Sequence, residues 1–545
     1  MIRTRTPDTA SQSKAMIAPG VVQKFKYIPV LFSDDSLTKK ASLNAIAACL
    51  DYAARLLVTF LTTPLLVAGL GDFYFGVWQM LLRLVGYVSP ASGRPTQALK
   101  MVLANQQSST DYDKKRRYVG SALAVWAMFL PLTLVLGGLL TWFAPRWVKS
   151  PAEYFGHVRF AAALLVVNLA VATLVALPQS VLEGENRAYK RMGLSALLTL
   201  LGGGFIWLVL HLKMGIVGVA GATLATTLMT GLFFLQVART YAPWFGIAMP
   251  DFQAARQFLN LSWWFLGWNL IMNLMMASDV VLLGVLDSVG AVTDYSLSKM
   301  APETVITIVA IVAFGIAPGL GSIIGSGSLQ RAARVRGEIM SLTWLIVTTL
   351  GFTVLLWNRA FIRLWVGAEH YVGTVPSLLI ILVIMQFVLI RNDGNFIDLT
   401  LRLRHKVLMG GFSVTISLIA AAVLVGYFRL GIVGLSIGLL FGRSILTFGY
   451  PMLVGRHLEI SLSSQLRAAL RPFLVTMLLF TFASALDSLS SAGRMVFRPG
   501  WFGLALAVGI TSVSSACLAF YIGLSHRQRS SILQRISYVL AIGTR

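Results

Sequence analysis

The chain has 545 residues, of which 57% are hydrophobic and only 12% charged, and its formal net charge is +24. A water-soluble globular fold is excluded, because so few polar residues cannot cover the surface of a protein of this size. The mean hydropathy of +0.76 and the successive apolar runs indicate one polytopic membrane protein. We therefore interpret the positive charge as a signal of how the chain is oriented in the membrane, and we expect no binding to nucleic acid.

Residues 1–40 form a basic arm that lacks the long apolar core of a cleavable signal peptide. We expect this arm to be cytoplasmic. The two cysteines, Cys49 and Cys517, lie inside apolar runs near opposite ends of the chain. Their positions predict neither a disulfide nor a metal site.

Apolar runs bounded by charged or turn residues predict fourteen membrane-spanning helices. Each run is long enough to cross a hydrocarbon core of ~30 Å, and a helix satisfies its own backbone there. The predicted spans are residues 42–70, 74–92, 119–143, 158–181, 193–211, 215–238, 262–286, 295–324, 339–357, 373–391, 408–428, 431–454, 471–489 and 500–523.

The distribution of basic residues between the loops predicts the orientation of these spans. If the amino terminus is inside, most of the 45 Lys and Arg residues fall in the arm, the inner loops and the tail. Lys and Arg are enriched in cytoplasmic loops. We therefore predict an even number of spans with both termini in the cytoplasm.

An internal repeat divides the chain into two similar halves. The stretch GIVGVAGATLATTLMTGLFF begins at Gly215, and a near copy, GIVGLSIGLLFGRSILTFGY, begins at Gly431. Arg187 and Arg404 repeat at almost the same separation, which supports a duplication. A small residue recurs at every fourth position, a pattern that lets two membrane helices approach closely. These positions are Gly218, Ala222 and Thr226 in the first copy and Gly434, Gly438 and Gly442 in the second.

The predicted fold is an all-α membrane protein with two six-helix lobes, residues 41–255 and 256–470. Because each lobe holds an even number of spans, the lobes share one orientation and a pseudo-twofold axis along the membrane normal. Residues 471–524 supply two additional helices outside the repeat. Residues 525–545 are basic and amphipathic, which is typical of a helix on the inner membrane surface.

The sequence offers little for an enzyme to use. The six histidines lie in loops or at span ends, without the spacing of a metal site. Residues 325–328 read GSGS but lack the Lys-Ser/Thr of a phosphate-binding loop. We therefore predict no catalytic residues, no metal and no cofactor.

Charged residues inside the predicted spans are the main functional candidates. A Lys or Arg at mid-membrane costs ~2.5 to 3.5 kcal/mol on insertion scales, so such residues normally face a protein interior or a wet cavity. The cations are Arg55, Arg83, Lys299 and Arg443, and the acids are Asp51, Asp279 and Glu303.

Local ion pairs are the structural alternative for several of these charges. Asp51 precedes Arg55 by one helical turn, and Lys299 precedes Glu303 by the same spacing, so each pair could form within one helix. Arg443 lies halfway along its span and either lines a cavity or forms a buried ion pair.

Arg83 has no carboxylate within its own predicted span. It therefore needs a partner on another helix, water or a ligand. If the four cations share one cavity between the lobes, that cavity would attract an anionic, partly polar cargo.

Three stretches of the sequence resemble a known family. They are PLLVAGLGDFYFGVW from Pro64 to Trp78, LEGENR from Leu182 to Arg187, and SDVVLLGVLDSVGAVTDYSLSKM from Ser278 to Met300. They resemble the polysaccharide transporter branch of the multidrug/oligosaccharidyl-lipid/polysaccharide flippase superfamily, and the likeness covers roughly residues 42–455. In one departure, Ala91 and Ser92 precede Gly93, where many relatives carry an aspartate, so any role of that acid does not transfer.

The resemblance implies a flippase that moves undecaprenyl-diphosphate-linked oligosaccharide across a bacterial inner membrane for exopolysaccharide, capsule or O-antigen synthesis. Its partners would be the lipid-linked oligosaccharide, membrane lipid and a polysaccharide polymerase or export machinery. We assign substrate attraction to four cations and proton or sodium coupling to three acids. The cations are Arg443, Arg83, Arg55 and Lys299, and the acids are Asp51, Asp279 and Glu303.

Two alternatives remain open from the sequence. A cation-coupled multidrug exporter would use the same lobes but would favour acidic residues in its cavity. A non-transporting membrane scaffold in a polysaccharide assembly complex would use the charges inside the spans only as paired structural contacts.

Overall fold

The computed structural model describes residues 37–93, 95–106, 109–185, 187–250, 252–325, 328–399, 403–491 and 500–533. Most of the predicted basic arm and the last part of the predicted amphipathic tail lie outside these ranges. The described chain is built from helices, as expected for an all-α membrane protein. The fold-class prediction is confirmed.

Each predicted span corresponds to an observed helix or to half of one. A short helix, α2, lies in a segment that was predicted as a loop. The helices are α1 (Leu37–Val88), α2 (Pro95–Asn105), α3 (Tyr112–Trp147), α4 (Phe155–Gly184), α5 (Met192–His211), α6 (Gly215–Tyr241), α7 (Phe252–Leu286), α8 (Val289–Gly325), α9 (Leu329–Trp365), α10 (Thr374–Leu399), α11 (Leu403–Ala422), α12 (Gly431–Leu458), α13 (Leu462–Ser491) and α14 (Trp501–Leu518).

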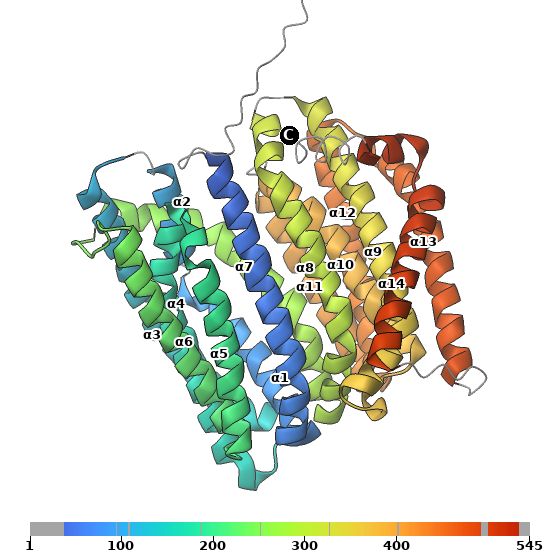
Figure 1. The fold of residues 1–545 in the computed structure, drawn as a ribbon, viewed down its shortest axis with the longest axis horizontal. Helices are drawn as coiled ribbons and strands as arrows, with labels where there is room; N and C mark the ends of the chain where they lie inside the picture. Colours follow the sequence, from blue (N-terminus) through green and yellow to red (C-terminus); the bar gives the residue numbers. More distant parts are fainter. Residues whose placement is uncertain are drawn as a thin grey trace, which may run out of the picture.

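Helix α1 contains the first two predicted spans, and a kink at Gly71 separates them. Gly71 has φ 73° and ψ 164°, a conformation outside the helical region that glycine adopts without a side-chain clash. The chain turns back there, so the two halves of α1 run in opposite directions (Figure 1). We call this end of the molecule the Gly71 end and the opposite end, where α1 begins, the Leu37 end.

The helices of the two halves pack in matching pairs. Helix α1 lies on α5 as α7 lies on α11, α4 lies on α6 as α10 lies on α12, and α3 lies on α4 as α9 lies on α10. Figure 1 shows the resulting two groups of helices, with α1 beside the second group. Helices α13 and α14 lie against α9, on the second lobe. The predicted two-lobe architecture is confirmed.

The turns that begin the repeated helices also have matching backbones. Lys213 and Gly215 have φ of 55° and 59°, and Arg429 and Gly431 have φ of 53° and 49°. A positive φ is uncommon outside glycine. The recurrence of this conformation at corresponding positions supports the internal duplication.

The small-residue stripe of the second copy packs α12 directly on α11. A Cβ atom at Gly434 would lie 2.9 Å from the carbonyl oxygen of Leu424, and one at Gly438 would clash with the backbone of Ala421. In the first copy Thr226 of α6 packs against Gly202 of α5, where an added Cβ atom would lie 2.7 Å from the methyl carbon of Thr226. The stripes therefore serve helix packing within each lobe.

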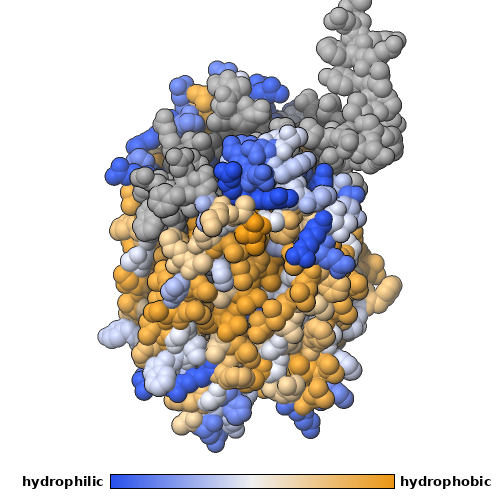
Figure 2. All heavy atoms as spheres, turned by 90° about the vertical axis from the view of Figure 1, so that its left-hand side faces the viewer, coloured by the Kyte–Doolittle hydropathy of each residue, from blue (hydrophilic) through white to orange (hydrophobic). Residues whose placement is uncertain are grey.

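The outer surface carries the apolar band of a membrane protein. Twelve helices in the described ranges are long and apolar enough to cross a membrane, and one of these, Cys49–Ser92, includes both halves of α1. Figure 2 shows the first lobe as a broad apolar belt with hydrophilic residues toward the two ends. This pattern fits a bundle with the Gly71 and Leu37 ends on opposite sides of a bilayer.

Candidate functional site: a charged network between the lobes

Three of the predicted site residues form one buried network in the second lobe. Lys299 of α8 contacts Asp279 of α7 and lies 2.9 Å from Glu303 on the next turn of its own helix. Tyr295 donates a hydrogen bond of 2.8 Å to Asp279. The side chains of Asp279 and Lys299 are only 3% and 7% exposed. Lys299 is therefore held by two carboxylates.

The first lobe reaches this network through Arg83 of α1. An Arg83 guanidinium nitrogen lies 3.8 Å from Glu303 Oε1, and both side chains are 30% exposed. One turn away, Tyr87 donates to the hydroxyl of Ser278 over 2.9 Å. Arg83 and Glu303 thus form the accessible edge of a network that joins the two lobes.

Arg443 of α12 is the third cation of this region. Its guanidinium donates to the backbone carbonyl of Met275 in α7 over 2.5 Å and lies 5.6 Å from the centre of the Phe387 ring. The residue is 4% exposed. At the corresponding position of the first repeat, Thr227 donates within its own helix, to the carbonyl of Thr223. The charge is therefore a specific property of the second lobe.

These charges lie near the middle of the bundle. Arg83 follows Gly71 by twelve residues, Lys299 follows the start of α8 by ten, and Arg443 follows the start of α12 by twelve. At 1.5 Å per residue these positions are about 15 to 18 Å from the Gly71 end. With all side chains ionised, three cations face two carboxylates. The network is therefore net positive at a depth where charges are costly.

Arg55 and Asp51 are placed apart from this network. Asp51 pairs with Arg191 at 3.5 Å instead of with Arg55, and Arg191 also contacts Glu183 at 3.0 Å. Arg55 is exposed on α1, and the structure gives it no ion pair within the described residues. Local spacing suggested an Asp51–Arg55 pair, but Arg191 approaches from the segment between α4 and α5. The predicted roles of Arg55 and Asp51 thus gain no support from geometry.

Pro302 interrupts the backbone hydrogen bonding of α8 beside the network. Proline has no N–H, so the carbonyl of Ser298 one turn earlier has no partner within the helix. Asn358 of α9 supplies one, donating a hydrogen bond of 3.0 Å to that carbonyl. The sequence indicated that Pro302 disturbs this turn, and the structure shows a buried amide that compensates for it.

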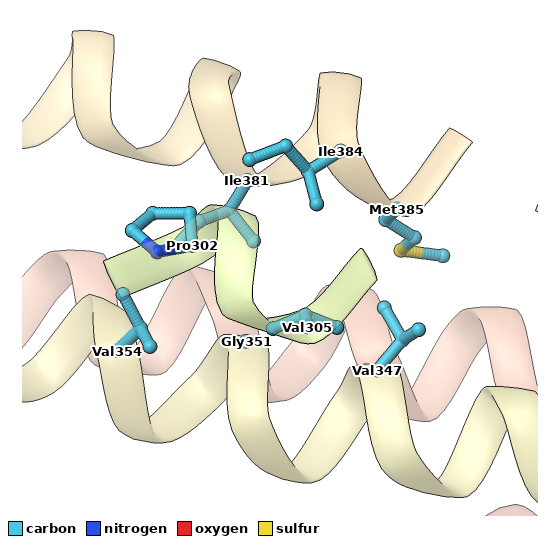
Figure 3. Close-up of a pocket in the computed structure, with 8 residues that line it drawn as sticks. All are labelled: Pro302, Val305, Val347, Gly351, Val354, Ile381, Ile384 and Met385. Atoms are coloured by element: carbon cyan, nitrogen blue, oxygen red, sulfur yellow. The ribbon is translucent and has the colours of Figure 1, made fainter. Parts of the chain in front are cut away.

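The opposite face of this turn is apolar. Figure 3 shows Pro302 and Val305 of α8 facing Ile381 and Ile384 of α10, with α9 beside them. The cavity between these side chains is only about 10 Å³. A buried water needs polar partners, and this lining offers none. The charges of α8 therefore project toward the lobe boundary and away from this apolar packing.

A second polar contact joins the lobes at the Gly71 end, which sequence reasoning missed. The ring of His370 lies 2.9 Å from Asp294 of α8 and 3.6 Å from Asp72 of α1. Thr293 donates to the backbone carbonyl of Asp72 over 2.6 Å. These residues are far apart in the sequence, and no short motif links them. Together they hold the lobes closed at this end.

The two glutamates of the LEGENR stretch form ion pairs that join helices of the first lobe. Glu185 forms a buried ion pair of 2.8 Å with Lys115 of α3, and Glu183 pairs with Lys100 of α2 at 2.9 Å. These contacts tie α2, α3 and α4 together at the Leu37 end. Within the described ranges, no group of three His, Cys, Asp or Glu residues is arranged to hold a metal ion.

Comparison with known proteins identifies the fold. No family model matches the sequence, and no curated protein matches it. A multidrug resistance MATE family transporter of the MOP superfamily, solved in an inward-facing conformation, matches with a TM-score of 0.57 and 16% identity. The match covers 76% of this chain and 98% of that transporter. The fold is that of the MATE transporters.

Two further solved structures agree. A variant of a Vibrio cholerae MATE transporter matches with a TM-score of 0.55 and 13% identity, over 77% of this chain and 98% of its own. Another MATE variant matches with a TM-score of 0.53 and 16% identity, over 77% and 96%. At these identities the likeness concerns the fold. About a quarter of this chain lies beyond each match.

Proposed function

We propose that this protein is an inner-membrane transporter that flips lipid-linked oligosaccharides by alternating access between its two lobes. The cargo would be an undecaprenyl-diphosphate-linked repeat unit for exopolysaccharide, capsule or O antigen. Both termini would lie in the cytoplasm, and a polysaccharide polymerase or export machinery would take up the product. The MATE fold supports membrane transport, and the sequence resemblance to polysaccharide transporters supports this cargo.

The observation that carries the proposal is the net positive charge where the lobes meet. Lys299 forms ion pairs with both Asp279 and Glu303. Arg83, in contrast, makes one longer contact of 3.8 Å with Glu303 and is partly exposed. Its guanidinium therefore retains free donors, and arginine binds phosphate through two parallel hydrogen bonds. A diphosphate placed here would meet Arg83 first, with Arg443 and Lys299 adding to the local positive charge.

A cation-coupled multidrug exporter is the second candidate, because the structures that share this fold include a multidrug resistance transporter. Such a transporter needs carboxylates that a cationic drug or a coupling ion can reach. Asp279 is buried against Lys299, so Glu303 is the carboxylate at the accessible edge. The excess of cations around it favours an anionic cargo.

The test combines gene deletion with mass spectrometry of undecaprenyl-linked oligosaccharides. Deletion is expected to cause accumulation of a complete, unpolymerised repeat unit and loss of surface polymer. Complementation by Arg83→Gln is expected to fail at normal protein level in the membrane. Complementation by Arg117→Gln, which changes an exposed arginine of α3 remote from the network, is expected to succeed.

Three results would contradict the proposal. Unchanged lipid-linked intermediates with new drug sensitivity would favour the multidrug exporter. Normal polymer export by the Arg83→Gln variant would remove the role given to that residue. Loss of polymer without accumulation of the repeat unit, together with loss of partner proteins from the membrane, would favour a scaffold.

A further inference from the structure

The second lobe contains a large cavity that is separate from the charged network. Its volume is about 990 Å³, and α9, α10, α12 and α13 form its walls, together with Arg527, Gln528 and Ser531. None of the network residues lines it. Ligand pockets in proteins typically measure ~300 to 1,000 Å³, so this cavity is at the upper end of that range.

The two lobes differ in how they fill this region at the Leu37 end. In the first lobe α2 packs against α3 and α4, and its Leu99 and Leu103 are completely buried. In the second lobe α8 continues as one helix to Gly325, and α9 begins at Leu329, so no separate short helix is inserted. The space between α9, α10 and α12 is instead bounded on its outer side by α13.

Most of the cavity wall is apolar, and the cavity opens toward the surface between α12 and α13. Four large apolar side chains of its lining are 43% to 54% exposed. They are Phe448, Leu466, Leu470 and Phe473. On a membrane-spanning surface these side chains face lipid. A hydrocarbon chain from the bilayer can therefore enter without leaving an apolar environment.

The Leu37 end of the cavity carries positive charge. Arg334 of α9 and Arg527 both line it and are exposed. Arg336 is neutralised by Asp393 through hydrogen bonds of 2.8 and 2.9 Å. One further carboxylate, Glu338, also lines the cavity. Arg334 and Arg527 are thus placed to receive a phosphate at the end of the cavity that the basic loops assign to the cytoplasmic leaflet.

We propose that this cavity is a binding site for an anionic phospholipid of the bilayer, of the phosphatidylglycerol type. Its phosphate would lie against Arg334 and Arg527, and an acyl chain would fill the apolar interior. This site is independent of the transported cargo. The bound phospholipid would hold α13 against the second lobe.

The test uses full-length protein purified in mild detergent, with phosphatidylglycerol and phosphatidylcholine of identical acyl chains. Native mass spectrometry measures bound lipid, and thermal unfolding measures stabilisation. We expect phosphatidylglycerol to bind more tightly and to raise the unfolding midpoint more. In the Arg334→Gln/Arg527→Gln variant its affinity should fall about 30-fold, since each basic residue near the headgroup adds about fivefold. Arg117→Gln, on the first lobe, should retain the wild-type affinity.

A second variant tests the apolar interior. Leu389 lines the cavity, and Leu389→Trp should reduce retention of both lipids while leaving Arg334 and Arg527 in place. Equal affinity for the two lipids, or equal loss in the Arg117→Gln control, would overturn the proposal. Recovery of a polyprenyl phosphate from the purified protein in place of a phospholipid would overturn it as well.

Discussion

At the scale of single residues, the contact between Asp279 and Lys299 is the interaction on which the network depends. Both side chains are buried, and Tyr295 adds a hydrogen bond to the carboxylate. Removing one partner of a buried ion pair leaves an uncompensated charge and typically costs ~3 to 5 kcal/mol, whereas replacing both partners with neutral groups is often tolerated.

We therefore predict that Lys299→Gln, which leaves the buried Asp279 without its cation, destabilises the protein by roughly 3 kcal/mol. Asp279→Asn should cost less, because Glu303 still pairs with Lys299. The double variant should recover most of this loss, which thermal unfolding in detergent will measure. If the pair only stabilises the fold, the double variant should also regain polymer export. If Lys299 contributes to cargo attraction, export stays low while stability returns.

Sequence reasoning at this scale found the charged residues but only part of their pairing. The spacing of Lys299 and Glu303 allowed an ion pair within one helix, and the two side chains lie 2.9 Å apart. The contact of Lys299 with Asp279 crosses the α7–α8 turn, and that of Arg83 with Glu303 crosses the lobes. Such partners depend on tertiary packing, which helical spacing does not describe.

At the scale of helices, the glycines of α12 allow it to contact α11 through the backbone. A Cβ atom at Gly438 would clash with Ala421, whereas one at Gly204 of α5 would meet nothing within 4 Å. The same substitution should thus have opposite effects at the two positions.

We predict that Gly438→Ala destabilises the protein by ~1 to 3 kcal/mol through overpacking. Gly204→Ala is expected to be neutral or to stabilise by up to ~1 kcal/mol, because alanine favours helix. Expression level and the unfolding midpoint of the two variants provide the measurement. Equal tolerance of both would show that α11 and α12 are not held at the separation described here.

The helices themselves were largely predictable, because long apolar runs of sufficient length can hardly adopt another structure in a bilayer. The exceptions have local causes. Helix α2 is short and carries Lys100, so it gave no span signal, yet Leu99 and Leu103 bury it against α3 and α4. The large cavity was also unpredicted, since it depends on how α9, α10, α12 and α13 fit together.

At the scale of the whole molecule, the lobes are joined from the Gly71 end to about mid-depth. His370, Asp294, Asp72 and Thr293 form the contact at the end, and Arg83 with Glu303 forms the contact in the middle. Alternating access requires the lobes to separate here when the opposite side closes.

We predict that a cross-link at the Gly71 end stops transport. Asp72 and Asp294 both face His370 and are partly exposed, so Asp72→Cys/Asp294→Cys can be joined by a short bis-methanethiosulfonate reagent, which forms a reducible disulfide with each cysteine. The background should carry Cys49→Ser and Cys517→Ser, because both native cysteines are exposed. Polymer export should fall after cross-linking and return on reduction, and either single-cysteine variant should be unaffected. Full export by the cross-linked protein would exclude separation of the lobes at this end.

The contact of Arg83 with Glu303 also has a consequence for biosynthesis. About 220 residues separate the two positions, and a ribosome adds ~5 to 20 residues per second, so Arg83 enters the membrane roughly 10 to 45 s before its carboxylate exists. During this interval the translocon and lipid headgroups must accommodate an unpaired guanidinium. Quality-control proteases therefore have the longest access to an incomplete charge network while only the first lobe has been synthesised.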